Sequence, residues 1–536
     1  MHKKIINKNN YISLDETTLI SLISLSIFGF ILNFIFSLNE ILNITILVFN
    51  LFLFIFLDKK NLSKILKKSF LYILILILVI TFSRNPEDSN LYHNSYIALI
   101  NNDKISFGIS NLHFRFGHTA FIQYLSALSY VPKISEYLII IQNNFFYCLV
   151  LSIFYKYFKT GLLKKDYFLS SFNALALIFF TLKFSKHSDW GIDLNPALLT
   201  VYLSSLIIYL SKKKISDSNF RFLYFYTGLI VLFIIFNRTT YSFLILFPFL
   251  ILILNKINVK ELFQLKLIIC FSIIVSLYVL KNFINTSCLL YPFYITCIET
   301  EWSSELIKHL NYKQIYYQSK AWSMGFPDST GNLSEEIYVK NFNWVNAWLS
   351  VHFLKIIEKI LPFLILVSLI FIFFNFYLPK KKIIEKNISY NIEYFYLIIF
   401  FTASIIFWFI NFPLYRYGAG FLITFAILLA SGLFVKIFKT KDYKISFILK
   451  FFLIVPLIIL SFKNIHRIIK EDSNPLLPLT FKNEQIDSKI MNSNAIYFYK
   501  NFEICYYPKL SPCVKDNIDF IKDIKTIKGY KFYLTK

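Results

Sequence analysis

The chain has 536 residues, of which 56% are hydrophobic, 19% aromatic and only 16% charged, and its mean hydropathy is +0.57. A soluble domain has no means of hiding that much apolar surface, so this composition excludes a soluble globular protein and indicates a polytopic membrane protein. The formal net charge of +25 would suggest nucleic acid as the partner of a soluble protein. Here the lysines stand in short loops between apolar segments, so we expect membrane lipids as partners and no nucleic acid.

Apolar segments long enough to cross a bilayer recur along the chain. The first one follows Lys3, Lys4 and Lys8 without a small-residue cleavage site, so we expect it to be retained as a signal anchor. The apolar-length rule predicts about thirteen spans, near 17–37, 40–57, 67–83, 135–158, 167–184, 195–211, 219–236, 240–255, 264–282, 355–378, 392–410, 418–437 and 446–462. The predicted fold class is therefore an all-α polytopic membrane protein.

The loops between these spans alternate in charge. One set is basic and holds, among others, Lys59, Lys164, Lys212, Lys260, Lys380 and Lys439. The intervening loops are mixed in charge and include the two longest, 84–134 and 283–354. Because lysine and arginine concentrate in cytoplasmic loops, the N-terminus is predicted to be cytoplasmic. We expect a membrane bundle over residues 1–462 and a small extracytoplasmic C-terminal domain over 463–536.

The loop 84–134 concentrates ionisable side chains between two apolar segments. Such groups are costly to hold at the mouth of a membrane bundle, so they indicate a functional site. Asp88 is a candidate general base that would deprotonate an acceptor hydroxyl. In SRNPEDSN the same residue also fits a turn or a helix N-cap, because Asn, Pro, Asp and Ser dominate turns.

Three arginines are candidates for binding an anionic headgroup, because guanidinium pairs with phosphate in a bidentate manner. They are Arg115, Arg238 and Arg416. His93 and His113 are candidates for hydrogen bonds to a sugar or a phosphate. The alternative for Arg238 and Arg416 is snorkelling, since both stand close to the ends of spans.

Three further features each have two interpretations. Asp189 and Asp193 fit caps of the span that follows them, which we favour. The tryptophans of the loop 283–354 fit interfacial anchors or sugar-stacking platforms. The segment 118–130 has helical spacing of apolar residues and fits either a helix in the membrane interface or a short packing helix.

Cys505 and Cys513 stand eight residues apart in the outward tail, where an oxidising compartment would allow a disulfide. The alternative is two free thiols that pack as small apolar groups. The chain has no Gly-rich phosphate loop, paired CxxC, HExxH or GxSxG motif. We therefore expect no ATP-driven transport, no zinc chemistry and no nucleotide cofactor.

Six short motifs stand out along the chain: DSNLYH at 88–93, NLHFRFGHTAF at 111–121, YP at 291–292, EW at 301–302, PLYRYGAGFL at 413–422 and CYYPKLSPC at 505–513. In this order they resemble a family of bacterial multi-pass membrane proteins of the lipid-linked-sugar glycosyltransferase type. That family is similar to the GT-C superfamily, which includes protein mannosyltransferases and aminoarabinose transferases.

The resemblance implies a GT-C-like helical bundle with long outward loops and a polyprenyl-phosphate-linked sugar as donor. It implies that Asp88, with Glu87 beside it, is the acidic residue that serves as catalytic base or metal ligand. A divalent cation is then a candidate cofactor, held by this pair if at all. The same likeness adds Tyr291 and Trp302 to the expected substrate-binding residues.

One departure from the family pattern concerns PLYRYG. Leu414 and Tyr415 stand where such enzymes carry an acidic partner for Arg416. The loss of that acid puts the activity of this member in question.

The resulting functional hypothesis is an integral-membrane glycosyltransferase of the bacterial inner membrane. It would move a sugar from its lipid carrier to a cell-envelope glycan, lipid or protein on the outer side. One alternative is a surface-polysaccharide polymerase or ligase of the O-antigen type, which relies on Arg and His more than on an acidic base. Another is a flippase or transporter without bond chemistry, which predicts polar residues in mid-span and internal repeats. Mid-span polar residues are sparse, the clearest being Gln142, Asn143 and Asn144.

Overall fold

The computed structural model describes most of the chain. The described residues are 12–57, 93–130, 138–183, 192–213, 217–258, 260, 264–303, 312–326, 334–380, 392–471, 486–491, 494–499, 513–514 and 521–535. Glu87, Asp88, Asp189, Cys505 and the expected span at 67–83 lie outside these residues.

Helices dominate the described chain, and seven of them are long and apolar enough to cross a membrane. These are α2 (Leu14–Asn33), α10 (Asp217–Asn237), α12 (Leu265–Thr286), α17 (Leu354–Tyr377), α18 (Ile392–Asn411), α19 (Tyr415–Thr440) and α20 (Ile445–Glu471). Further apolar helices are α3 (Glu40–Leu57), α7 (Leu138–Leu163), α8 (Tyr167–Lys183), α9 (Leu194–Leu210) and α11 (Phe247–Asn255), the last preceded by the 3₁₀ helix η5 (Thr239–Leu246). The protein is a helical membrane protein, as its composition predicts. Within the described residues each expected span coincides with a helix, while the total of thirteen spans stays a prediction.

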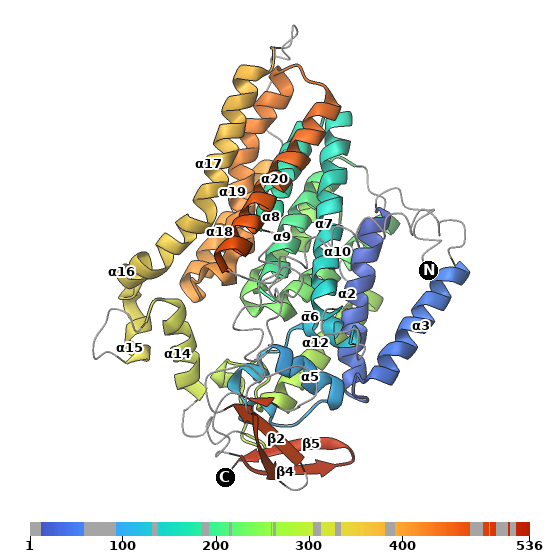
Figure 1. Ribbon diagram of the computed structural model, residues 1–536, viewed down its shortest axis with the longest axis vertical. Helices are drawn as coiled ribbons and strands as arrows, with labels where there is room; N and C mark the ends of the chain where they lie inside the picture. Colours follow the sequence, from blue (N-terminus) through green and yellow to red (C-terminus); the bar gives the residue numbers. More distant parts are fainter. Residues whose placement is uncertain are drawn as a thin grey trace.

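Two helices form the centre of the bundle (Figure 1). Every residue of α8 from Phe168 to Phe180 is buried, and α9 is buried along almost its whole length. Both helices pack against α19, and α7 covers them from another side. A helix that is apolar all round needs neighbours all round. The outer helices α3, α12, α17 and α18 leave large apolar side chains exposed, as expected of surfaces that face lipid; examples are Phe49, Ile273, Phe376 and Phe395.

The segment 118–130 forms the helix α6 (Phe121–Leu128), in which all eight residues are buried. It packs against α2, α5 (Asn94–Asn102) and α7. Its polar residue Gln123 is used internally, because its side-chain oxygen accepts a hydrogen bond from the Ala120 amide at 3.1 Å. The interfacial interpretation of this segment is therefore wrong, and the packing interpretation is confirmed.

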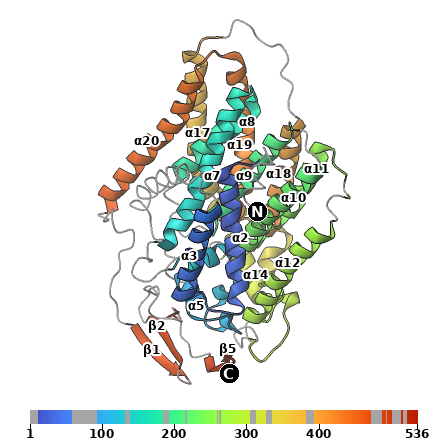
Figure 2. The ribbon, with the colours of Figure 1, turned by 90° about the vertical axis from the view of Figure 1, so that its right-hand side faces the viewer.

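The two ends of the bundle collect different loops. At one end Lys380 and Lys441 form an isolated β-bridge, and Lys212 Nζ lies 2.8 Å from the Asp166 carboxylate. The other end carries α5, α14 (Tyr312–Ser323) and the C-terminal strands (Figure 1, Figure 2). The described basic loops thus lie at one end of the bundle, and the described loops of mixed charge lie at the other.

The C-terminal tail contains strands, for which the sequence analysis made no prediction. Three of them form a sheet in the order β1 (Ile486–Met491), β2 (Asn494–Tyr499) and β3 (Cys513–Val514), with β1 and β2 antiparallel and β3 parallel to β2. A separate hairpin consists of β4 (Ile521–Ile527) and β5 (Tyr530–Thr535). Lys528 and Gly529 connect its strands, both with positive φ, as a two-residue hairpin turn requires.

The hairpin docks on the loop that follows α5. The Phe107 amide donates to the Lys531 carbonyl at 2.8 Å, and the Tyr533 amide donates to the Phe107 carbonyl at 3.0 Å. The rings of Phe107 and Phe532 stack with centroids 4.3 Å apart. Lys531 Nζ also lies 2.9 Å from the Asp103 carboxylate. The C-terminal hairpin is therefore fixed to the loop that follows α5.

The first turn of α2 holds a buried carboxylate that the sequence analysis did not single out. Glu16 is fully buried and accepts hydrogen bonds from the hydroxyls of Tyr157 on α7 and Tyr202 on α9, the latter at 3.2 Å. Lys156 Nζ lies 3.6 Å away, and the Ser13 amide donates to the same carboxylate at 2.7 Å. These contacts join α2 to the centre of the bundle.

Replacing Glu16 by alanine should destabilise the protein by about 3–5 kcal/mol, because buried hydroxyls and a lysine lose their common partner. The measurement is the midpoint of thermal unfolding of the purified protein in detergent. Glu40→Ala is the matched control, since Glu40 also stands in the first turn of a helix but is exposed. Equal midpoints for the two variants would contradict the anchoring role of Glu16.

Candidate functional site

Four α-helix ends and one short 3₁₀ helix bring ionisable side chains together at the end of the bundle that carries the strands. His93 directly precedes α5, Asp193 precedes α9, and Arg238 follows α10. Arg416 stands in the first turn of α19. Arg115 comes from the short 3₁₀ helix η3 (Phe114–Gly117). We call this set the arginine cluster; it consists of His93, Arg115, His118, Asp193, Arg238 and Arg416.

An ion pair lies at the centre of the arginine cluster. Arg238 donates through Nε to the Asp193 carboxylate, and both side chains are about three-quarters buried, at 23% and 25% exposure. The Arg238 guanidinium lies over the ring of Tyr417 at 4.7 Å, and that of Arg416 approaches the same ring at 5.3 Å. Arg416 also lies 5.2 Å from the ring of Trp322. Tyr417 therefore contacts two guanidinium groups.

The titration behaviour of the arginine cluster follows from burial and from these charges. Burial lowers the pKa of His93 to about 3; Asp193 opposes this effect, and Arg238, Arg115 and Arg416 add to it. His93 is therefore neutral near pH 7 and hydrogen-bonds Gln123 at 3.3 Å. All three candidate arginines act on this one imidazole.

For the Asp193 carboxyl, the neighbouring positive charges outweigh the effect of burial on the pKa. Burial raises its pKa, but the charge and hydrogen bond of Arg238, followed by Arg416 and His93, bring the pKa below its ordinary value. Asp193 therefore stays ionised. His118 keeps a solvent-exposed surface, yet loss of hydration, with Arg238 and Arg115, lowers its pKa to about 4.

The favoured interpretation of Asp193 as a helix cap is wrong. Asp193 occupies the N-cap position of α9 with αR backbone angles and makes no side-chain cap hydrogen bond. An N-cap side chain can reach the first helical amides when its own backbone is extended, which is not the case here. Its carboxylate is used by Arg238 instead.

The backbone around Arg238 and Arg416 is held by cross-links between helices. The Thr240 hydroxyl donates to the Tyr417 carbonyl at 2.9 Å, and the Gly420 amide donates to the Tyr241 hydroxyl at 2.9 Å. The Asn237 side chain accepts from the Ile122 amide at 2.9 Å, which ties α10 to α6. These bonds fix α10, η5 and α19 relative to one another.

The turn before α19 is fixed by two tryptophans. The Trp348 indole donates to the Pro413 carbonyl at 2.5 Å, and the Trp408 indole donates to the Leu414 carbonyl at 3.0 Å. A Cβ atom on Gly418 would lie 2.4 Å from the Trp408 ring, so glycine is required there.

Tyr291 and His113 flank the arginine cluster. Tyr291 is buried and contacts His118 edge to face at 4.9 Å. A Cβ on Gly117 would lie 2.8 Å from the Tyr291 ring, so glycine permits this close approach. His113 accepts a hydrogen bond from the Arg115 amide at 3.2 Å and stacks on Phe114 at 4.9 Å. His113 therefore shapes the turn that presents Arg115.

Trp302 lies apart from the arginine cluster, at the docked hairpin. Its ring contacts Phe107 at 5.1 Å and Phe532 at 6.4 Å, and its carbonyl accepts from the Asn111 side chain at 3.1 Å. Trp322, from the same loop 283–354, does reach the arginine cluster, through its contact with Arg416. The sequence analysis assigned it to the general group of interfacial or stacking residues.

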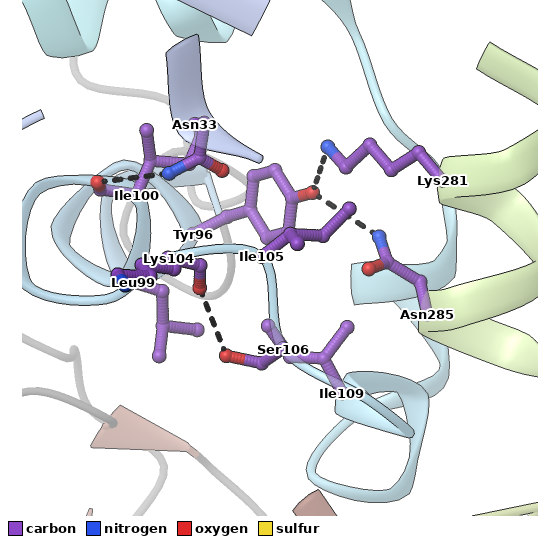
Figure 3. A pocket seen from close by; sticks show the side chains of 10 residues that line it. All are labelled: Asn33, Tyr96, Leu99, Ile100, Lys104, Ile105, Ser106, Ile109, Lys281 and Asn285. Carbon is purple, nitrogen blue, oxygen red and sulfur yellow. Dashed lines mark hydrogen bonds between the residues drawn. The ribbon is translucent and has the colours of Figure 1, made fainter. Parts of the chain in front are cut away.

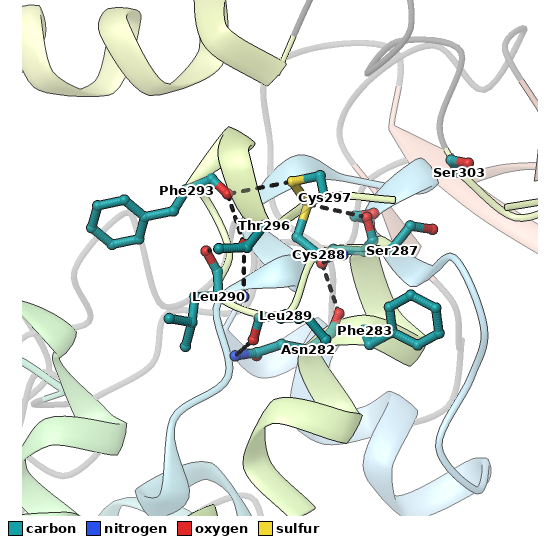
Figure 4. The surroundings of a disulfide bond; sticks show 12 residues. Asn282, Phe283, Ser287, Cys288, Leu289, Leu290, Phe293, Thr296, Cys297 and Ser303 are labelled. Atoms are coloured by element: carbon teal, nitrogen blue, oxygen red, sulfur yellow. Dashed lines mark hydrogen bonds between the residues drawn. A yellow bond between two sulfur atoms is a disulfide. The ribbon is translucent and has the colours of Figure 1, made fainter. Parts of the chain in front are cut away.

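A disulfide that the sequence analysis missed joins Cys288 and Cys297 just after α12 (Figure 4). The two strands of this loop pair through the Leu289 amide and the Thr296 carbonyl at 3.0 Å. Tyr291 lies in this loop, and its ring contacts His118. Both cysteines lie near the start of the loop 283–354, which the charge pattern predicts to face outward, and this placement was the available signal. The predicted bond between Cys505 and Cys513 falls partly outside the described residues.

The described residues contain no group of three or more His, Cys, Asp or Glu side chains arranged to hold a metal ion. Glu87 and Asp88, the expected acidic pair, lie outside the described residues, so a divalent cation at that pair stays a prediction. The described residues of the site provide guanidinium donors beside neutral imidazoles. This arrangement is suited to binding an anionic group.

Fold and site together define a helical membrane protein with a basic cluster at one end of its bundle. The model of the family described as Domain of unknown function (DUF8201) matches residues 1–423, and the chain belongs to this family. No curated protein and no solved structure matches the chain.

Acidification should destabilise the folded protein through His93. Its folded-state pKa of about 3 lies below the ordinary value of 6.5, so the unfolded chain binds this proton first as the pH falls. Stability is then lost from about pH 6.5 downward, by up to about 1.4 kcal/mol per pH unit. His93→Gln should flatten this part of the pH dependence in thermal unfolding between pH 4.5 and 8. The exposed His466 provides the control variant His466→Gln; an unchanged slope in His93→Gln would refute the assignment.

Proposed function

We propose that this protein is an integral-membrane glycosyltransferase that takes sugar from a polyprenyl-phosphate carrier. The observation that carries the proposal is the convergence of Arg115, Arg238 and Arg416 on one site with His93 and His118. Guanidinium groups pair with phosphate oxygens, and partly buried ones do so in a medium that strengthens the attraction. Snorkelling alone would not bring three arginines from separate helices to one site.

The acceptor side of the bundle is proposed to be extracytoplasmic, in the inner membrane of a bacterium. The charge pattern of the loops supports this orientation. The Cys288–Cys297 disulfide supports it independently, because disulfides persist in oxidising compartments. The disulfide, the arginine cluster and the docked hairpin all lie at the same end. The N-terminus is then cytoplasmic and the C-terminus extracytoplasmic, with thirteen spans.

The proposed reaction is a single displacement at the anomeric carbon. The acceptor hydroxyl loses its proton to Asp88 and forms a bond to the anomeric carbon. The bond between that carbon and the phosphate oxygen breaks, and the lipid phosphate leaves with its negative charge stabilised by the arginines. The anomeric centre is inverted. In the sequence Asp88 precedes His93 by five residues, and His93 belongs to the arginine cluster.

Asp88→Asn should lower sugar transfer by about a hundredfold to ten-thousandfold, the usual contribution of a general base. The assay incubates purified protein with a panel of polyprenyl-linked sugars and detects the glycosylated product, with and without a chelator. Glu299→Gln is the control, since Glu299 is an exposed acid of an outer loop.

Normal turnover by Asp88→Asn would refute the base. Failure of the wild-type protein to form product from any donor would refute the transferase. Movement of lipid-linked sugar across reconstituted vesicles without product would identify a flippase instead.

A surface-polysaccharide polymerase or ligase is the second candidate. It is favoured by one observation, namely that arginine and histidine predominate among the described ionisable residues of the site. Such an enzyme would depend on these residues more than on an acidic base.

Charge reversal at the arginines, compared with Asp88→Asn, separates the two candidates. Arg115→Glu and Arg416→Glu should each lower turnover at least about tenfold in both cases, because each puts a carboxylate beside a phosphate. Only the polymerase or ligase should keep its activity in Asp88→Asn. Lys528→Glu, in the exposed hairpin turn, controls for net charge. Full activity in both arginine variants would exclude a phosphate-binding role for the arginine cluster.

A further inference from the structure

A lysine is buried within the bundle, away from the arginine cluster. Lys281 belongs to α12, and only 2% of it is exposed. Its ammonium group donates to the hydroxyl of Tyr96 on α5 at 2.6 Å and to that of Tyr124 on α6. It also lies 4.4 Å from the ring of Tyr124 and 5.7 Å from that of Phe30 on α2. An ionisable side chain inside a membrane bundle indicates a function.

The described part of the chain offers Lys281 no carboxylate within 4.0 Å. Tyrosine hydroxyls and aromatic rings contribute dipoles and quadrupoles but no negative charge. A buried ammonium without a counter-charge is costly, and the cost falls when an anion lies beside it.

A small recess opens beside this lysine (Figure 3). Lys281 and Asn285 of α12 line one side, and Asn33, Lys104 and Ser106 line the other. Its complete lining contains two lysines and no acidic residue. The free space accommodates about one water-sized particle. The recess is therefore very small, and Lys281 is the cationic side chain buried beside it, since the Lys104 ammonium lies toward the docked hairpin.

We propose that this recess binds a small monatomic anion of the halide class, with chloride as the physiological ligand. Lys281 supplies the positive charge, and the Asn285 amide group, now 3.5 Å from the Tyr96 hydroxyl, supplies a further donor. The size of the recess excludes phosphate, diphosphate and lipid headgroups. This site is independent of the proposed glycosyl transfer.

The position of the site indicates what the anion would stabilise. Lys281 connects α12 with α5 and α6, and Lys104 lies 5.1 Å from the ring of Tyr530 in the docked hairpin. An anion bound beside Lys281 would hold α12 against α5 and α6. Binding to the folded state alone raises the unfolding temperature.

Thermal unfolding of the full-length protein in detergent tests the site. Sodium chloride or bromide is titrated against sodium gluconate at constant ionic strength, so that only the size of the anion changes. We expect a saturable rise of the unfolding midpoint by a few degrees in both halides. Bromide should also give an anomalous scattering peak beside Lys281 in crystals.

Lys281→Met should abolish the halide dependence, and Lys266→Met, on the exposed start of the same helix, should keep it. A buried lysine replaced by an apolar side chain of similar length is commonly tolerated. Should Lys281→Met not fold, Asn285→Leu serves in its place. This variant should raise the halide concentration needed for half of the rise in unfolding temperature about tenfold. The proposal fails if wild-type protein unfolds equally in halide and gluconate. It also fails if Lys281→Met keeps the wild-type rise of the unfolding temperature in halide. It fails as well if Asn285→Leu needs the same halide concentration as the wild type for half of that rise.

Discussion

The ion pair between Asp193 and Arg238 is the interaction on which the arrangement of the site depends. It joins the start of α9 to the end of α10, and both partners are about three-quarters buried. A partly buried pair is screened less than a surface pair, and loss of one partner leaves the other uncompensated. Three arginines at one place repel one another, so their approach requires a negative charge nearby. Asp193 supplies one within the described chain, acting on both Arg238 and Arg416.

The helices could be predicted from the sequence because apolar length is a local property. The prediction of one basic set and one mixed-charge set of loops also agrees with the described loops at the two ends of the bundle. Within the site, Arg115, Arg238, Arg416 and His93 were identified individually as candidates. Their common location could not be predicted, since it depends on how α9, α10 and α19 pack.

Two of the features that sequence reasoning missed, Glu16 and Lys281, have partners that are distant in the sequence. Glu16 stands one residue before the predicted span 17–37, and its tyrosine partners come from α7 and α9. Lys281 stood inside a predicted span, and only the approach of α5 and α6 shows what surrounds it. The Cys288–Cys297 loop was obscured because both cysteines adjoin apolar segments. In a bundle, such polar residues are held by pairing that hydropathy does not record.

The absence of an acidic residue beside Arg416 in PLYRYG is compatible with the structure. The turn before α19 is held through the backbone carbonyls of Pro413 and Leu414, each of which accepts from a tryptophan indole. Those bonds do not depend on the side chain at position 414, so leucine is compatible with the turn. The counter-charge for Arg416 comes instead from Asp193, across the bundle. A motif records neighbours in the chain, whereas electrostatic pairing requires only neighbours in space. The absence of an acidic residue from PLYRYG therefore does not by itself remove the electrostatic environment of the arginine.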